Sequence, residues 1–360
     1  MSNPTLEALT VAVKAGLPIA LRGRPGVGKT SMIESVAKQL DLDCEVVIGS
    51  LREPSDFAGL PVVRADGTVS LAPPSWAVRA QDSFRGCVVL LDELTTASPA
   101  VQAAMLRVVR ERVAGDLKMD DGVRIVAAYN DARDCGGYEL ELPMRSRMIH
   151  LDVAVDSRNF VDGLLNGWES QRVMLAGRPG KDCRSKWTQL VATFIQVRPG
   201  LLEVDPQPHT SGGYPCPRSW SLVIEAAAAA ENLGASDDAR LLLVSGAIGA
   251  GAASEFFSWF DNLDLPDPAA VLANPSLVSQ YLETGRPDRA LIVLSSVVDL
   301  AIERKTAAAW TNAWIVESKA VEAGFGDIVG WTGRRLVRHR PTEAKLPPEF
   351  ERVKEFLVAA

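Results

Sequence analysis

Apolar residues in the first half of the chain alternate between short continuous runs and stretches with helical spacing. Continuous runs are typical of strands buried on both faces of a sheet, while spacings of three and four residues are typical of amphipathic helices. Strands that alternate with helices in this way predict an α/β fold with a mostly parallel sheet. The expected strands lie in "LPIALRG", "CEVVIG", "GCVVLLDEL", "VRIVAAYN" and "MRSRMIHLDV".

The pattern changes after about Val153, where strand patterns almost vanish and helical periodicity dominates. Breaks rich in proline and glycine near 177–180, 206–217 and 264–275 interrupt it. We therefore predict an α/β nucleotide-binding domain over 1–154, an all-helical lid over 155–262 and a helical C-terminal extension over 263–360. The expected helices span 156–168, 185–197, 217–234, 237–260, 286–320 and 349–358. A hairpin with Asp66-Gly67 at its turn is expected before them, in "RADGTVSLAPPSWA".

The composition fits a soluble globular protein, with 47% apolar and 23% charged residues in 360. No apolar run is long enough for a membrane span, and the N-terminus lacks a secretory pattern, so we expect no membrane insertion. Five scattered cysteines without a C-x-x-C pair favour a reducing cytoplasm over a disulfide framework or zinc site. The net charge of −7 gives no support for a general polyanion binder.

The first strand-to-helix junction, "LRGRPGVGKTSM", carries the pattern Gly-x-x-x-x-Gly-Lys-Thr of a P-loop. Its glycines let backbone N–H groups close around phosphates, and the following helix adds its positive end. Lys29 would reach the outer phosphates, and the Thr30 hydroxyl would bind Mg²⁺. The sequence thus predicts ATP and Mg²⁺ binding. The expected binding residues are Gly23, Pro25, Gly26, Val27, Gly28, Lys29, Thr30 and Ser31.

The run "VVLLDEL" would supply the acidic half of the site. Its apolar strand carries Asp92 and Glu93 to the carboxyl edge of the sheet, where open α/β sheets bind ligands. We expect Asp92 to hold the Mg²⁺ shell and Glu93 to orient and activate the attacking water.

Together these stretches resemble the AAA+ ATPases, and among them the MoxR-type family. "GRPGVGKT" and "LLDEL" resemble its nucleotide motifs, and "SLREPSDFAGLPV" resembles the segment after its second strand. "AAYNDARDCGGYELELPMRSRMIHLDV" resembles its sensor-1 and arginine-finger region, and "CPRSW" resembles the start of its sensor-2 helix. The resemblance covers about residues 5–262 and does not extend to 263–360.

The resemblance implies roles for four more residues. Asn130 matches sensor 1, whose amide bonds the attacking water or the γ-phosphate. Arg147 aligns best with the finger that reaches a neighbouring subunit's γ-phosphate, although Met148 replaces the commoner Phe; Arg145 is the alternative or an auxiliary finger. Arg218 matches sensor 2. A cation at the positive start of a helix is unfavourable, which also favours a nearby phosphate.

Two surface features have open interpretations. Phe57 and Trp76 either contact a substrate on the central surface of a ring or pack beneath their loops, as large aromatic residues usually do. The run "GRRLVRHRP" at 333–341 either binds nucleic acid or an acidic partner, or is a solvated helix end. Its arginines are Arg334, Arg335, Arg338 and Arg340.

The resemblance implies a ring-forming ATP hydrolase, expected to be a hexamer, that remodels protein partners in a chaperone-like way. A separate chain with a von Willebrand A domain is the client type that the family suggests. One alternative is a nucleic-acid-dependent AAA+ motor, for which the basic run is the support. Another is a scaffold whose assembly ATP controls, with hydrolysis incidental.

Overall fold

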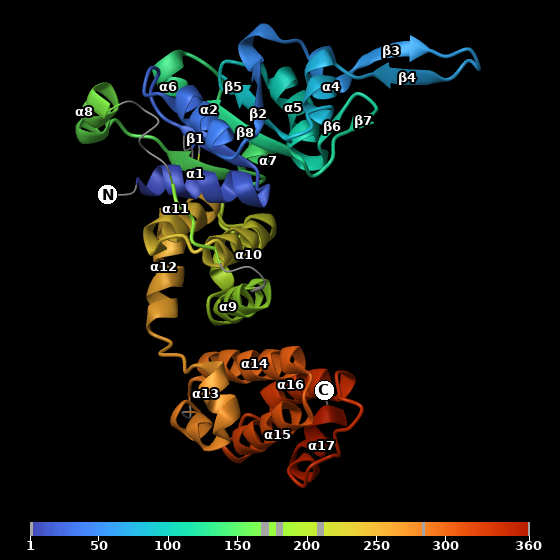
Figure 1. Cartoon of the computed structure of the whole chain (residues 1–360), viewed down its shortest axis with the longest axis vertical. Helices are drawn as coiled ribbons and strands as arrows, with labels where there is room; N and C mark the ends of the chain where they lie inside the picture. The colour runs from blue at the N-terminus through green and yellow to red at the C-terminus, as the bar shows by residue number, and fades with distance from the viewer. Residues whose placement is uncertain (1–2, 167–172, 178–182, 207–211, 283–284, 359–360) are drawn as a thin grey trace. The chain divides into compact units, whose positions relative to one another are not determined.

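Five parallel strands form the sheet of this computed structural model, which describes residues 3–166, 173–177, 183–206, 212–282 and 285–358. The strand order is β2-β5-β8-β1-β9, as Figure 1 shows. The predicted α/β fold with a parallel sheet is confirmed. The strands are β1 (Ile19–Arg22), β2 (Asp43–Ile48), β5 (Cys87–Asp92), β8 (Val123–Tyr129) and β9 (Ile149–Asp152).

Helices cover both faces of the sheet, which is why its strands are continuously apolar. One face packs against α1 (Pro4–Ala15) and α2 (Lys29–Gln39). The other packs against a second set of helices, whose apolar residues share one core cluster with the sheet. This set is α3 (Ser55–Ala58), α4 (Ser75–Gln81), α5 (Pro99–Glu111) and α7 (Leu142–Arg145). The chain also forms two short helices, η1 (Gly49–Leu51) after β2 and α6 (Ala132–Cys135) after β8.

Two hairpins extend from this framework. The predicted hairpin is confirmed as β3 (Leu60–Val63) paired with β4 (Val69–Ala72), and Figure 1 shows it reaching beyond the helices. The second pairs β6 (Val113–Ala114) with β7 (Leu117–Lys118). At the base of the first hairpin, Phe57 and Trp76 are each 1% exposed, with ring centroids 5.9 Å apart. These aromatics therefore pack beneath their loops, and the substrate-contact interpretation is not supported.

The chain divides into two compact units. The first, called the sheet unit, comprises residues 1–184 and 200–254. Besides the sheet it contains α8 (Ser157–Asn166), η3 (Pro199–Leu201), α10 (Pro217–Asn232) and α11 (Asp237–Ile248). The helix α11 packs on α1 and β9, and Glu7 accepts bonds from the backbone and hydroxyl of Ser236 at the start of α11 (2.8 and 2.7 Å). The division of the helical half into a lid and an extension stays a prediction.

The C-terminal unit comprises residues 185–199 and 255–360, and its helices from α13 onward share a core around Trp310 and Trp314. Its helices are α13 (Pro268–Ala273), η4 (Pro275–Gln280), α14 (Pro287–Arg304), α15 (Ala307–Glu322), α16 (Gly326–Arg338) and α17 (Phe350–Val358), together with most of α9 (Arg184–Val197) and the later part of α12 (Ala250–Asp261). None of the helices described here combines the length and apolar character that crossing a bilayer requires.

Two long helices expected from periodicity are each two helices. The expected helix 237–260 is α11 and α12, because Gly249 between them has φ 83°. The expected helix 286–320 is α14 and α15, because Lys305 adopts a left-handed conformation with φ 53°. The apolar spacing continues through the second break, since α14 and α15 pack into one core.

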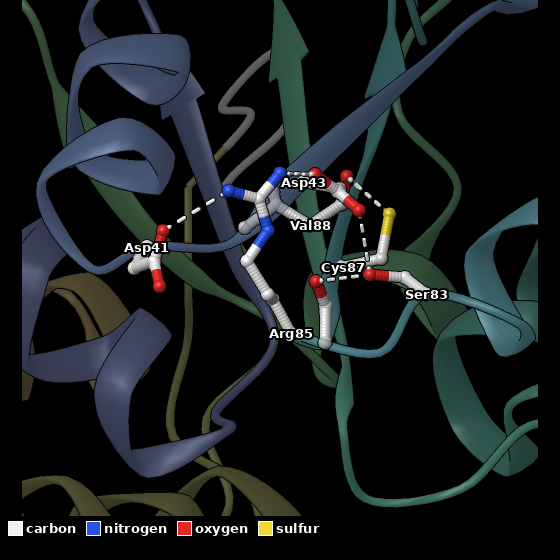
Figure 2. A network of polar contacts seen from close by, with 7 residues as sticks. Asp41, Asp43, Ser83, Arg85, Cys87 and Val88 are labelled. Carbon is white, nitrogen blue, oxygen red and sulfur yellow. Dashed lines mark hydrogen bonds and ion pairs between the residues drawn. The ribbon is translucent and has the colours of Figure 1, made fainter.

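A polar network closes the turn into β5 at the amino ends of β2 and β5, the edge opposite the P-loop (Figure 2). Arg85 lies between Asp43 and Asp41, at 2.6 and 3.2 Å. The Ser83 hydroxyl donates to Asp43 (2.8 Å), and with Arg85 it holds the pKa of that carboxyl below its ordinary value. The network fixes the register of two neighbouring strands, and we assign it a structural role.

Candidate functional site

The predicted P-loop connects β1 to α2 within the sheet unit. Gly26 and Gly28 have φ 80° and 90°, a region that only glycine enters readily. Gly23 is needed for space, because a Cβ there would lie 2.5 Å from the Val153 carbonyl oxygen. Gly28 precedes α2 without a side-chain cap, so the first N–H groups of the helix are not capped by a side chain at that position. The loop has the backbone properties of an anion cradle.

Lys29 brings the P-loop and the predicted sensor together. Its side chain is buried, and its Nζ donates to the carbonyl oxygens of Gly23 and Arg24 at 2.8 and 3.1 Å. It also donates to Asn130 Oδ1 at 2.7 Å, although 101 residues separate the two in sequence. The parallel pairing of β1 with β8 produces this meeting, because Asn130 directly follows β8.

Thr30 and Asp92 form the second contact between predicted site residues. The Thr30 hydroxyl donates to Asp92 Oδ2 at 2.8 Å. A hydroxyl beside one carboxylate fits Mg²⁺, which usually keeps waters and substrate phosphates as its other ligands. No group of three or more His, Cys, Asp or Glu residues that could hold a metal occurs among the described residues. The donor set therefore suits a metal held jointly with a phosphate.

Glu93 lies next to Asp92 in a constrained conformation. Its φ is 59°, and its backbone N–H donates to Asp92 Oδ1 at 2.8 Å. A non-glycine residue in this region is uncommon and is often found at functional sites. Its carboxylate accepts a hydrogen bond from the Ser50 hydroxyl and lies 3.4 Å from the Thr96 hydroxyl.

Ser50 is a site residue that sequence reasoning missed. It follows β2, whose last residue Ile48 pairs with Asp92 at the end of β5. Residues that follow neighbouring parallel strands meet at one edge of the sheet. The order of β2 beside β5 would have been the signal, and the linear sequence does not contain that order.

Arg145 is built into the interior. It is 5% exposed, its Nε donates to the Gly212 carbonyl at 2.9 Å, and its guanidinium lies over the Tyr214 ring, 5.4 Å from the centroid. Burial lowers the pKa of Arg145 below its ordinary value. Its side chain ties α7 to the segment that leads into α10.

Arg147 and Arg218 lie near each other, and both are bonded to residues 143–146. Arg147 donates from Nη1 to the Pro143 carbonyl at 2.7 Å, while its buried Nε has no hydrogen-bond partner among the described residues. Arg218 is exposed and donates to the Ser146 hydroxyl at 3.3 Å. Burial lowers the pKa of Arg147, as do the nearby charges of Arg218 and Arg110. A cluster of like charges of this kind is suited to an anion.

A cleft of about 550 Å³ opens beside the P-loop within the sheet unit. Gly23, Val27 and Val153 line it, together with Asp131. Arg22 and Asp152, paired in register at the ends of β1 and β9, form a two-pronged ion pair in its wall (2.5 and 2.7 Å). Apolar side chains beside a phosphate cradle suit a nucleotide.

Comparison with known proteins gives matches over part of the chain. Residues 18–148 match the AAA domain of the dynein-related subfamily. The chain is similar to the protein MoxR of Methylorubrum extorquens, with 32% identity over 108 residues, which is 30% of this chain and 31% of MoxR. A crystal structure described as a "putative ATPase" from Cytophaga hutchinsonii covers 67% of this chain and 79% of its own, with 19% identity and a TM-score of 0.41.

The matched segment, with its P-loop and its acidic strand end, is an AAA domain of an ATPase family that binds nucleotides. Over this segment the chain is similar to AAA+ proteins of the MoxR type. The chain matches about a third of the length of MoxR, 31%, and the rest of MoxR has no counterpart in this match.

Proposed function

We propose that this chain binds ATP with Mg²⁺ through the sheet unit and hydrolyses it in a ring of identical subunits. The observation that carries the proposal is the convergence of Lys29 with Asn130 and of Thr30 with Asp92 from three strands of one sheet. Such convergence is hard to explain as packing, because the groups are polar and cluster at the carboxyl edge of the sheet.

The roles of the residues follow from their chemistry. The backbone N–H groups of Gly26 and Gly28 would hold the phosphates, and Lys29 would exchange its carbonyl partners for phosphate oxygens. Thr30 and Asp92 would hold Mg²⁺, which neutralises charge on the phosphates when it is bound.

Glu93 is the proposed proton acceptor for the attacking water, which Asn130 would help to orient. Ser50 competes for the same carboxylate, so release of that hydrogen bond would free Glu93 for the water. The amide of Asn130 would exchange one of its bonds in the same way, because its Oδ1 already accepts from Lys29.

The arginines point to a shared site. Arg147 is bonded to α7 and Arg218 to the residue that follows α7, and we infer that Arg147 serves a second copy of the chain while Arg218 senses the nucleotide. The buried Arg145 favours Arg147 as the finger that stabilises charge on the γ-phosphate of that copy. We extend the proposal to a hexameric, chaperone-like machine of the cytoplasm that acts on a protein client, of which a von Willebrand A domain protein is the first candidate.

The nucleic-acid alternative has lost part of its support. Arg335 pairs with Asp299, and Arg340 donates to the Ala344 carbonyl while lying over the Trp310 ring. Arg335 and Arg340 of the basic run are thus engaged within the C-terminal unit. Stimulation of ATP hydrolysis by DNA or RNA that falls steeply with salt would restore this alternative.

Purified Glu93→Gln and Lys29→Ala test the proposal against Lys38→Ala, an exposed lysine on the same helix. Glu93→Gln should bind ATP and lose hydrolysis, whereas Lys29→Ala should lose binding as well. Lys38→Ala should behave as the wild type. Turnover near the wild-type rate in Glu93→Gln would refute the assignment. A client retained by Glu93→Gln with ATP would identify the partner, and a ring whose output survives in that variant would favour the scaffold alternative.

A further inference from the structure

A buried tyrosine and histidine connect the end of β8, which Asn130 follows, to the segment 145–147 that carries Arg145 and Arg147. Tyr129, the last residue of β8, and His150 in β9 are 0% and 6% exposed, and the Tyr129 hydroxyl lies 2.7 Å from His150 Nδ1. We propose that the Tyr129–His150 pair is a positioning link, through which the nucleotide site of one subunit sets the arginine that the same subunit offers to its neighbour. This proposal rests on the shared site proposed above.

The pair spans a strand that lies between its two members. In the order β8-β1-β9, Tyr129 is level with Arg22 of β1, and His150 is level with Ala20. All four therefore project on one face of the sheet, because side chains two residues apart share a face. The small side chain of Ala20 leaves room for the tyrosine to cross β1 and meet the imidazole edge to face, with centroids 5.8 Å apart.

The hydrogen bonds have one consistent direction. His150 Nε2 lies 3.0 Å from the Arg145 carbonyl oxygen, which accepts and cannot donate. Nε2 must therefore carry the proton, Nδ1 must accept, and the Tyr129 hydroxyl must donate to it. Burial lowers the pKa of His150 to about 4, so the ring is neutral near pH 7 and this tautomer persists.

Each end of the link connects to a functional group. Tyr129 precedes Asn130, whose Oδ1 accepts from Lys29 in the P-loop. At the other end, the Arg145 carbonyl accepts the hydrogen bond from His150 Nε2, and Arg145 is the last residue of α7, two residues before Arg147. The Arg145 side chain extends the connection to Gly212, ahead of α10 and Arg218. If the end of β8 moved toward a bound phosphate, the hydrogen bonds from Tyr129 to His150 and from His150 to Arg145 would therefore move the segment 145–147 as well.

Packing alone does not require this chemistry. Phenylalanine and leucine would fill the same space in the core, whereas this pair places two hydrogen bonds in the interior, where each partner depends on the other. The Tyr129–His150 pair does not involve Asp152, the last residue of β9, which forms a separate ion pair with Arg22. The link is therefore distinct from the contact that clamps the two strands.

A mixed-subunit experiment separates a link from a structural role. Subunits with Arg147→Ala keep their own P-loop and Glu93 but offer no finger; subunits with Glu93→Gln offer the finger but cannot hydrolyse. The two full-length chains are co-expressed with different tags and purified through both. ATP hydrolysis by the mixture then reports only fingers that Glu93→Gln subunits give to Arg147→Ala subunits.

Tyr129→Phe is then introduced on one side at a time. In the Glu93→Gln subunit it should lower the restored kcat by roughly 2- to 10-fold, the effect of one buried hydrogen bond, with little change in KM. In the Arg147→Ala subunit it should leave the rate near that of the parent mixture. His150→Leu in the finger-giving subunit should act like Tyr129→Phe, and the double variant should lose no more than either alone. Tyr138→Phe, the same change on an exposed side chain, is the control.

The outcomes distinguish the proposed Tyr129–His150 link from the proposed nucleotide site shared between subunits. If the parent mixture hydrolyses no more ATP than its separate components, the shared site is wrong, and the link falls with it. If the mixture is active and Tyr129→Phe acts equally on both sides, or on neither, the shared site stands and the link is overturned. Thermal melts of each subunit show whether a loss on both sides reflects unfolding.

Discussion

Two arginines that are neighbours in sequence differ in what they can contribute. Arg145 is buried, with bonds to Gly212 and a stacked Tyr214, while Arg147 is half-buried, with an Nε that no described residue satisfies. A residue that must reach another chain cannot also be fixed in its own core. These contacts favour Arg147 over Arg145 as the proposed finger.

We expect Arg147→Ala to lower kcat for ATP by roughly 10³-fold or more, the usual contribution of an arginine finger, with a small change in stability. Arg145→Ala should instead lower the free energy of unfolding by about 1–3 kcal/mol, because it leaves the Gly212 carbonyl unpaired. Steady-state kinetics and urea unfolding of the two variants measure both quantities. Full activity in Arg147→Ala together with a kinetic loss in folded Arg145→Ala would exchange the two roles.

Two cysteines at the amino edge of the sheet should be chemically inert. Burial raises the pKa of Cys87 to about 12 and of Cys44 to about 11, so both remain thiols at neutral pH. Iodoacetamide at pH 8 should leave both unmodified in the native chain and alkylate them in urea, as read by peptide mass spectrometry. Rapid native alkylation of Cys87, beside the network of Figure 2, would show that this edge opens.

Among the elements, the P-loop was predictable and its surroundings were not. Gly23, Lys29, Asp92 and Asn130 follow patterns that can be read along the chain, since each ends a strand or begins a helix. The partners Ser50 and His150 come from strands whose neighbours are fixed only when the sheet forms. The helix breaks at Gly249 and Lys305 were missed for a related reason, because apolar spacing reports which residues are buried and not the backbone conformation between two helices.

The junction of β1 with the P-loop offers a test at this scale. A Cβ on Gly23 would overlap the Val153 carbonyl of the chain after β9, so Gly23→Ala should force β1 and β9 apart. We expect a loss of about 1–3 kcal/mol in the free energy of unfolding and weaker ATP binding.

Gly200→Ala is the matched control, because a Cβ there meets nothing within 4 Å. Thermal melts and titration with a fluorescent ATP analogue compare the two variants. Unchanged binding in Gly23→Ala would mean that the loop does not need the close approach of the chain after β9.

At the scale of the whole molecule, the α/β fold and the helical second half were predictable from periodicity. The burial of a carboxyl group in the C-terminal core was not predictable, because nothing in the sequence around Glu317 distinguishes it from an exposed helical glutamate. In the structure it is 0% exposed, bonded to the Thr332 hydroxyl at 2.9 Å, while its Oε1 has no partner among the described residues. A buried acid in that position makes the free energy of unfolding of the C-terminal unit depend on pH.

Burial raises the pKa of Glu317 from 4.5 to about 8. The folded unit therefore keeps a proton that the unfolded chain releases between pH 4.5 and 8, and stability must fall as pH rises through this window. Glu317→Gln removes the titration, so its advantage over the wild type should grow from pH 5 to pH 8 by an amount on the order of 3 kcal/mol. Urea unfolding of the full chain, followed by tryptophan fluorescence, measures it, with the exposed Glu322→Gln on α15 as control. Parallel pH profiles for wild type and Glu317→Gln would show that the core carboxyl ionises as it does in water.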